Sequence, residues 1–199
     1  MPATGIRAEA SGRVREAIVE ATVRIVARDG VAAVTHRRVA EEARVSLSST
    51  TWHFAAKADI LLAALRWTAD REVRRITAIA ERLETRAFDA AVWAEELADW
   101  LIEQVTGERD VAVALYRLQI ELIGRPEAQA VHREWGAGLD ALGEQVLHGS
   151  ATPTPELDTR LVVAALDGLR LGVLSAADAD ADTGWLRPAV RRQLVALLG

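Results

Sequence analysis

The five prolines of this chain are confined to a few places, and their distribution constrains the fold more than any other feature. They are Pro2, Pro126, Pro153, Pro155 and Pro188 in a sequence of 199 residues. Because proline interrupts helices and central strands, the stretches between these positions are free to form long regular elements. Apolar residues recur in them at intervals of three and four residues and not in alternation, which favours helices. We therefore expect an all-α protein.

Helical spacing is clearest near the N-terminus, where Val14, Ile18, Ala21 and Ile25 share one face. Gly30 follows at the position where a glycine cap ends a helix. The same reasoning along the chain gives about nine helices. They are predicted at about 11–28, 36–43, 47–53, 57–84, 88–106, 108–123, 127–147, 156–176 and 185–198.

The charge of the chain is unevenly distributed. The net charge is −5, yet residues 1–60 carry nine basic and seven acidic side chains, a net charge of +2, which leaves −7 for residues 61–199. A weakly basic head on an acidic remainder is compatible with DNA binding at one end, because phosphate attraction is screened within about 10 Å. A difference of this size also arises by ordinary variation, so it does not decide the function by itself.

Several classes of protein are disfavoured by what the sequence lacks. It contains no cysteine, which removes disulfides, thiol nucleophiles and thiolate metal sites. No signal peptide is recognisable, and no apolar stretch reaches the roughly 18 residues of a membrane span. Paired Glu-x-x-His spacings, a phosphate-binding glycine loop and a nucleophile elbow are also missing. We therefore expect a cytoplasmic protein that is not an enzyme and uses no metal or cofactor.

Two short helices joined by a tight turn are predicted near residue 44. Thr35 is placed to cap the first and Ser46 the second, because a hydroxyl accepts from the free N–H groups of the following turn. Arg44 and Val45 form the turn, and we expect Val45 to be buried between the helices. The second helix carries short hydrogen-bonding side chains that we expect to be exposed, namely Ser48, Ser49, Thr50 and His53. Such a helix suits a DNA major groove, although an ordinary solvated surface is the alternative.

This pattern resembles the DNA-binding domain of the TetR family of transcriptional regulators over about residues 13–65. The resemblance rests on Gly30, Val34-Thr35, Val39-Ala40, Ala43-x-Val45-Ser46 and His53-Phe54-x-x-Lys57. It implies that residues 47–53 form the recognition helix. It also implies phosphate contacts by Thr35, Arg37 and Arg38 at the start of the preceding helix and by Lys57 at the start of the next one.

Two residues depart from the family pattern. Arg44 stands in the turn where glycine is usual, and a left-handed backbone there costs about 1 kcal/mol or more. Either Arg44 offsets this cost by reaching a phosphate, or the turn is remodelled. Thr51 stands where tyrosine is common, with the aromatic side chain moved to Trp52. The predicted DNA-binding residues are Thr35, Arg37, Arg38, Arg44, Ser46, Ser48, Ser49, Thr50, Trp52, His53 and Lys57.

For residues 61–199 the resemblance implies a helical domain that binds a small molecule and dimerises, next to a DNA-binding domain at 1–60. The candidate ligand-binding residues are an aromatic set with several polar side chains: Trp67, Trp93, Trp100, Tyr116, Gln119, His132, Trp135, Asp167 and Arg170. A mostly apolar effector is expected. Aromatic residues at helical spacing also fill cores, and Arg170 is equally compatible with an internal or interface ion pair.

The helices at 156–176 and 185–198 are expected to form the dimer contact. Gly168 and Gly172 permit close approach in a segment that is apolar nearly all round, which a partner or the chain's own core could bury. A palindromic operator requires two recognition helices about 34 Å apart, and hence a homodimer. The hypothesis is a repressor that a small-molecule effector releases from DNA through the helix at 57–84. The alternatives are an activator and an architectural or partner-controlled regulator without such a ligand.

Overall fold

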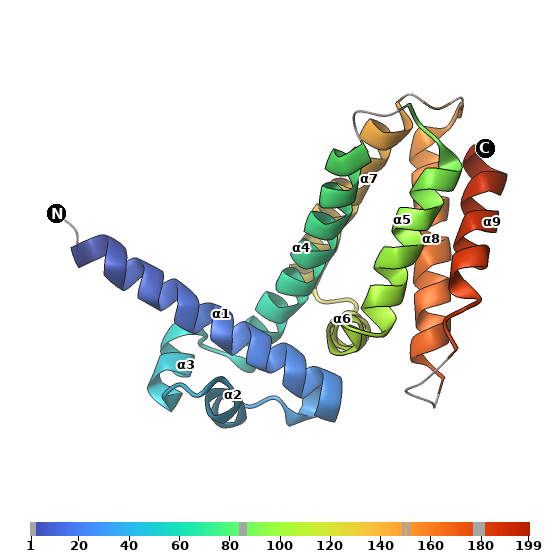
Figure 1. The fold of residues 1–199 in the computed structure, drawn as a ribbon. Coiled ribbons are helices and arrows are strands. Elements are labelled where there is room, and N and C mark those ends of the chain that lie inside the picture. Colours follow the sequence, from blue (N-terminus) through green and yellow to red (C-terminus); the bar gives the residue numbers. More distant parts are fainter. Residues whose placement is uncertain (1–2, 84–86, 149, 151, 177–181) are drawn as a thin grey trace. The chain divides into compact units, whose positions relative to one another are not determined.

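The structure is a computed structural model that describes residues 3–83, 87–148, 150, 152–176 and 182–199. Within these residues it contains nine α-helices, one short 3₁₀ helix and no strand (Figure 1). The elements are α1 (Ala3–Asp29), η1 (Val31–Ala33), α2 (His36–Ala43), α3 (Leu47–His53), α4 (Lys57–Leu83), α5 (Ala90–Val105), α6 (Arg109–Glu121), α7 (Pro126–Leu147), α8 (Pro155–Leu174) and α9 (Leu186–Leu198). The all-α prediction is confirmed. The main difference is that α1 begins earlier than predicted.

The helices divide into two compact units, which we call the head and the body. The head contains Met1–Ala69 together with Asp110–His132, and the body contains Asp70–Arg109 together with Arg133–Gly199. α4 and α7 contribute to both units, whereas α6 groups with the N-terminal helices. The predicted boundary at residue 60 follows the motif, whereas these units follow contacts between helices.

The core of the head forms where α1 packs against α2 and α3. Ile18 and Ile25 of α1 are fully buried, as are Val34 and Val39 from the segment that follows. α1 ends at Asp29 because Gly30 has φ 83° and ψ 169°, a conformation that favours glycine. The end of α1 and the start of α2 are therefore fixed by local sequence.

α6 is attached to the end of α1 by one side chain. Arg117 Nη1 donates to the carbonyl oxygens of Val26 and Ala27, both at 2.8 Å. The Val26 carbonyl also accepts the N–H of Gly30 at 3.1 Å. Carbonyls at the end of a helix generally lack donors within the helix, so a guanidinium there adds hydrogen bonds and complements the helix dipole. Arg117 thus holds α6 against the helix that supports the turn.

The body is built on α5, α8 and α9, which lie side by side (Figure 1). Leu101, Leu186 and Val190 are fully buried in its core, and Leu97 and Leu166 are nearly so. None of the described helices is long and apolar enough to cross a membrane.

Candidate nucleic-acid interface and ligand cavity

The two short helices of the head are capped as predicted. The Thr35 hydroxyl accepts from the backbone N–H of Arg38 at 3.2 Å, and the Ser46 hydroxyl accepts from that of Ser49 at 3.0 Å. Each such cap contributes about 1 kcal/mol to helix stability. His36 adds a link between the two helices, since its Nε2 donates to the carbonyl oxygen of Phe54 at 2.9 Å.

The turn between α2 and α3 depends on an unusual backbone conformation. Arg44 has φ 56° and ψ 40°, the left-handed region, and it is the one non-glycine residue with positive φ in the described chain. Its N–H donates to the carbonyl of Glu41 at 3.2 Å, and that of Val45 donates to Ala40 at 3.0 Å. The predicted turn is present, and of the two alternatives for Arg44 the backbone adopts the left-handed one. The predicted burial of Val45 is not observed, because the short helices leave it half-exposed.

Thr50 lies on the wrong side of α3 for the role assigned to it. Its side chain is fully buried, and its hydroxyl donates to the carbonyl oxygen of Ser46 at 3.2 Å. The prediction that Thr50 is exposed is therefore wrong, because helix α3 turns this residue toward the core of the head. Ser48 is exposed as predicted, and Ser49 is half-buried.

The exposed face of α3 carries Leu47, Thr51 and Trp52, of which only Trp52 was among the predicted DNA-binding residues. Leu47 is 49 % exposed, Trp52 is 74 % exposed, and Thr51 is also exposed. Helical spacing could have found Leu47 and Thr51, because positions 47, 48, 51 and 52 fall on one side of a helix with 3.6 residues per turn.

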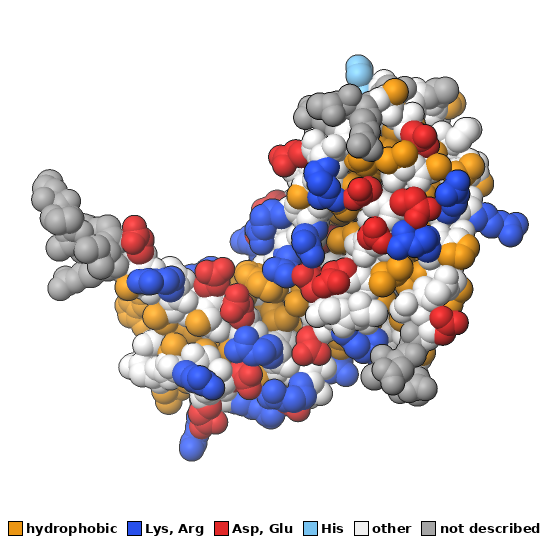
Figure 2. Space-filling model, viewed as in Figure 1, with side chains coloured by type: hydrophobic (Ala, Val, Ile, Leu, Met, Phe, Trp, Pro, Cys, Tyr) orange, Lys and Arg blue, Asp and Glu red, His pale blue; other side chains and the backbone are white. Residues whose placement is uncertain are grey.

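Several arginines in the head form ion pairs with neighbouring acids. Glu42 receives Arg24 and Arg28 at 3.0 and 3.1 Å, which lowers the pKa of its carboxyl. Of the residues expected to contact phosphate, Arg37 pairs with Glu41 at 3.1 Å and Arg38 with Asp29 at 2.6 Å. Figure 2 accordingly shows blue and red side chains interspersed over the head on the face in view. Pairs this exposed contribute at most about 1 kcal/mol, so phosphates can displace them.

Two further cations of the helix-turn-helix motif are Arg44 and Lys57. Arg44 is exposed and forms no ion pair with any described residue. Lys57 is half-buried, with Nζ 3.4 Å from the carbonyl oxygen of Ala32. Burial, assisted by the charge of Arg15, lowers the pKa of the His53 imidazole. The described residues contain no cluster of side chains suited to a metal ion.

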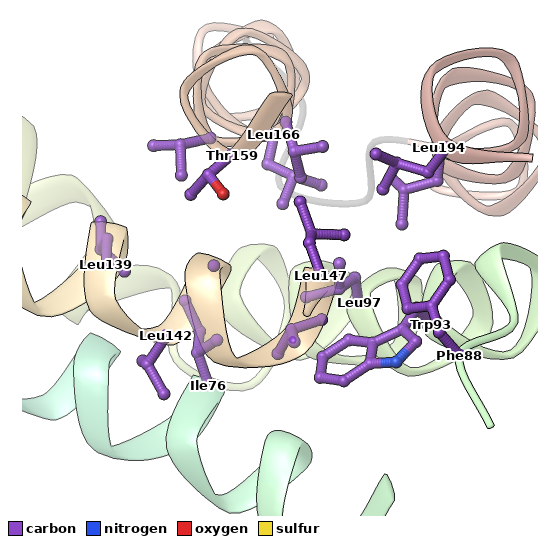
Figure 3. Close-up of a pocket in the computed structure, with 15 residues that line it drawn as sticks. Ile76, Phe88, Trp93, Leu97, Leu139, Leu142, Leu147, Thr159, Leu166 and Leu194 are labelled. Carbon is purple, nitrogen blue, oxygen red and sulfur yellow. The ribbon is translucent and has the colours of Figure 1, made fainter. Parts of the chain in front are cut away.

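The body contains a cavity of about 90 Å³ with an apolar lining (Figure 3). Thr159 is the only polar side chain among its lining residues, and its hydroxyl donates to the carbonyl of Pro155 at 2.8 Å. Aliphatic and aromatic side chains from five helices and the segment before α5 form the rest. They are Ile76, Phe88, Trp93, Leu97, Leu139, Leu142, Val146, Leu147, Val162, Val163, Leu166, Leu194 and Leu198, with Gly143 between them.

A buried polar cluster centred on Arg170 joins three helices of the body. Arg170 is 1 % exposed, and its Nη1 donates to Glu72 of α4 and Gln104 of α5, both at 2.8 Å. Its Nη2 pairs with Asp167, and the guanidinium lies 5.7 Å from the ring centroid of Trp100. Burial raises the pKa of the Glu72 carboxyl, and the charge of Arg170 opposes that rise. The internal ion pair considered for Arg170 is therefore present.

The predicted ligand-binding residues are divided between the two units. Trp93 lines the apolar cavity, and Trp100, Asp167 and Arg170 belong to the polar cluster. Trp135 also lies in the body, whereas the remaining members lie in the head, namely Trp67, Tyr116, Gln119 and His132. Sequence reasoning missed the leucines and valines of the lining, because nothing in the sequence distinguishes them from core residues.

The fold and the capped turn define a helix-turn-helix DNA-binding protein with a second helical unit that encloses a cavity. Two family descriptions match the chain: "Bacterial regulatory proteins, tetR family" at residues 18–64, and "Tetracyclin repressor-like, C-terminal domain" at residues 88–199. The chain belongs to the TetR family and is a transcriptional regulator. A comparison with curated protein sequences gave no match.

Solved structures extend the similarity over nearly the whole chain. A TetR family member from Streptomyces coelicolor A3, SCO1917, is 33 % identical with a TM-score of 0.72, covering 94 % of this chain and 98 % of its own. The multidrug binding protein EbrR in complex with imidazole is 33 % identical with a TM-score of 0.67, covering 93 % and 94 %. A transcriptional regulator from Rhodococcus sp. Rha1, at 22 % identity and a TM-score of 0.77 over 92 % and 95 %, shares the fold.

Proposed function

We propose that this regulator is a homodimeric repressor that binds a palindromic operator and is released by a mostly apolar small molecule. The observation that carries the proposal is the helix-turn-helix of the head, with a capped α3 whose outer face is exposed. The apolar cavity in a separate unit supports control by a ligand. A dimer places two copies of α3 at successive turns of the operator.

The DNA-binding step is tested by selecting duplexes from a random pool and measuring affinity against random DNA. Lys57→Ala should weaken binding to every sequence and lower the salt slope by about 1, because one phosphate is then no longer neutralised. Arg133→Ala is the matched control, since Arg133 is an exposed cation in the body. If no sequence is enriched over random DNA, operator recognition by this protein is refuted.

The dimer is supported by an apolar stripe on α8 that the described chain leaves exposed. It consists of Leu157, Leu161, Ala164, Gly168, Leu171 and Gly172. Helices approach closely where glycine replaces a side chain, and an uncovered apolar stripe on a soluble helix indicates a partner surface. This surface fits a second copy of α8, because a twofold interface uses the same patch on both subunits.

Substitution of one glycine tests the dimer without disturbing the subunit. A Cβ at Gly168 meets no atom within 4 Å, so Gly168→Lys is compatible with the folded chain. We expect it to give a monomer by light scattering and to lose operator binding. Gly136→Lys is the control, since that glycine also has open space around it. A dimer that persists in Gly168→Lys places the interface elsewhere.

The effector is tested with compounds that the similar protein EbrR binds, since its structures include complexes with ethidium and malachite green. Malachite green is the better first probe, because ethidium inserts between base pairs by itself. Binding should quench tryptophan fluorescence and lower operator affinity, and operator DNA should lower dye affinity by the same factor. If the dye binds without changing operator affinity, release by this ligand is contradicted. An activator or partner-controlled regulator is then favoured.

A further inference from the structure

The outer face of α3 is apolar at both ends, which is unusual for a short helix in solvent. Leu47 stands at its first position with 49 % of its side chain exposed, and Trp52 stands near its last with 74 % exposed. The ring of His53 meets the Trp52 ring edge-on, with 4.6 Å between the two centroids. An exposed large hydrophobic pair on a DNA-reading helix indicates an apolar target.

The hydroxyl groups of the same helix are already engaged with one another or with the backbone. The Ser46 hydroxyl lies 2.8 Å from that of Ser48 and 2.7 Å from that of Ser49. Thr51 donates its single hydroxyl proton to the carbonyl oxygens of Leu47 and Ser48, at 3.2 and 3.1 Å. Thr51 therefore presents its methyl group and an acceptor oxygen, and not a free donor, on this face.

The major groove offers one apolar feature on a base edge, the 5-methyl group of thymine. We propose that Leu47 and Trp52 contact thymine methyl groups, and that α3 thus selects A·T pairs at defined positions of each half-site. Leu47 occupies the N-terminal end of the helix, which is the end that contacts base edges in helix-turn-helix proteins. The proposal rests on the operator recognition proposed above and specifies what the recognition helix reads.

Deoxyuridine tests this directly, because it differs from thymidine only by the absent methyl group and keeps the same pairing edge. Thymidines of a selected operator are replaced one position at a time in both half-sites, and affinities are measured for the wild type and for Leu47→Ala and Trp52→Ala. Each of the two side chains should contact one thymine methyl group. Replacing that thymidine by deoxyuridine should weaken wild-type binding about fourfold per methyl, which is the factor for burying one carbon of this size. The matching alanine variant should lose that sensitivity while remaining sensitive at the other position.

Arg133→Ala is the control, because Arg133 is an exposed residue of the body and its variant should retain both deoxyuridine effects. Since Leu47 and Trp52 are exposed, their alanine variants should keep the helical circular dichroism of the wild type. The inference is overturned if every deoxyuridine duplex binds like its thymidine parent, or if both alanine variants keep the full wild-type penalties. It is also overturned if the selected operators lack thymine. Failure of the proposed function is distinguishable, because then no duplex is selected over random DNA.

Discussion

The head and the body differ in how they treat buried polar groups. In the head, capping hydroxyls and His36 satisfy the backbone around the turn, and no buried side-chain polar atom of its described residues is left without a partner. In the body, Glu72 Oε2 and Trp100 Nε1 are buried with no hydrogen bond to the described residues. An unsatisfied buried polar atom costs about 1–3 kcal/mol, so the body retains local free energy that a rearrangement could recover.

This contrast matches the different tasks that we propose for the two units. A reading head needs one geometry, and every polar bond around its turn favours that geometry. The body combines an apolar cavity of about 90 Å³ with a buried ion pair between α4 and α8, and a change in the packing of its helices would alter both. A ligand favours one packing over another only by binding the two differently.

The largest test of the contrast is removal of Arg170, which should damage the body and spare the fold of the head. Arg170→Met leaves the buried Glu72 carboxylate without its 2.8 Å partner. Breaking a buried pair on one side costs about 3–5 kcal/mol, because an uncompensated charge remains inside. Urea denaturation of wild type and variant measures the loss in free energy of unfolding. A loss below about 1 kcal/mol would mean that the pair is not buried as described.

The pH dependence of the stability lost in Arg170→Met tests whether the unpaired Glu72 carboxylate causes the loss. Burial raises the pKa of Glu72 and Arg170 opposes the rise, so the variant's folded-state pKa is higher still. The folded variant then binds more protons than the unfolded chain, and its stability falls as pH increases. The deficit should be smaller at about pH 5 than at about pH 8, and adding Glu72→Gln should abolish this difference. An equal deficit at both pH values contradicts the assignment.

A smaller effect in the body should come from Gly143, where α7 meets α8. A Cβ there would overlap the buried side chain of Thr159, which is β-branched and has little freedom to move. Gly143→Ala should lower the free energy of unfolding by about 1–3 kcal/mol. Gly136→Ala is the matched control in the same helix, since it meets no atom within 4 Å and should raise stability by about 0.5–1 kcal/mol. Thermal unfolding of the pair measures both signs, and equal shifts would refute the close contact.

The same contrast explains what the sequence could predict. Local signals specify the head: Thr35, Gly30 and Ser46 set helix ends, and they are recognisable because capping depends on neighbours in sequence. The burial of Thr50 was missed, since a seven-residue helix offers too few apolar positions to fix its buried face. The body's cavity depends on contacts among α4, α5, α7, α8 and α9, which no local pattern encodes. Trp93 is therefore the single candidate that lines it.

A smaller loss of stability is expected from Arg117, which links α6 to the end of α1 within the head. Arg117→Met removes two 2.8 Å hydrogen bonds to the end of α1, although the Val26 carbonyl keeps the one that it accepts from Gly30. Because Arg117 is exposed, we expect a loss of about 1 kcal/mol in stability. Urea denaturation measures this loss. Arg125→Met, which changes another exposed arginine of the head, is the control and should leave the stability unchanged.

The smallest expected effect on stability comes from Arg44, whose substitution should act mainly on DNA binding by the head. Arg44→Gly relieves the left-handed conformation at φ 56°, worth about 1 kcal/mol, but glycine costs about 0.5–1 kcal/mol of chain entropy on folding. The net change in the free energy of unfolding should therefore be near zero or slightly favourable. If Arg44 reaches a phosphate, affinity for all sequences should fall and the salt slope should decrease by about 1. Arg44→Ala separates the two effects, since it removes the same charge and retains the backbone cost. Equally weakened DNA binding in both variants, at a stability close to that of the wild type, would show that this arginine is retained for its charge. Binding as tight as that of the wild type in both variants would contradict this role.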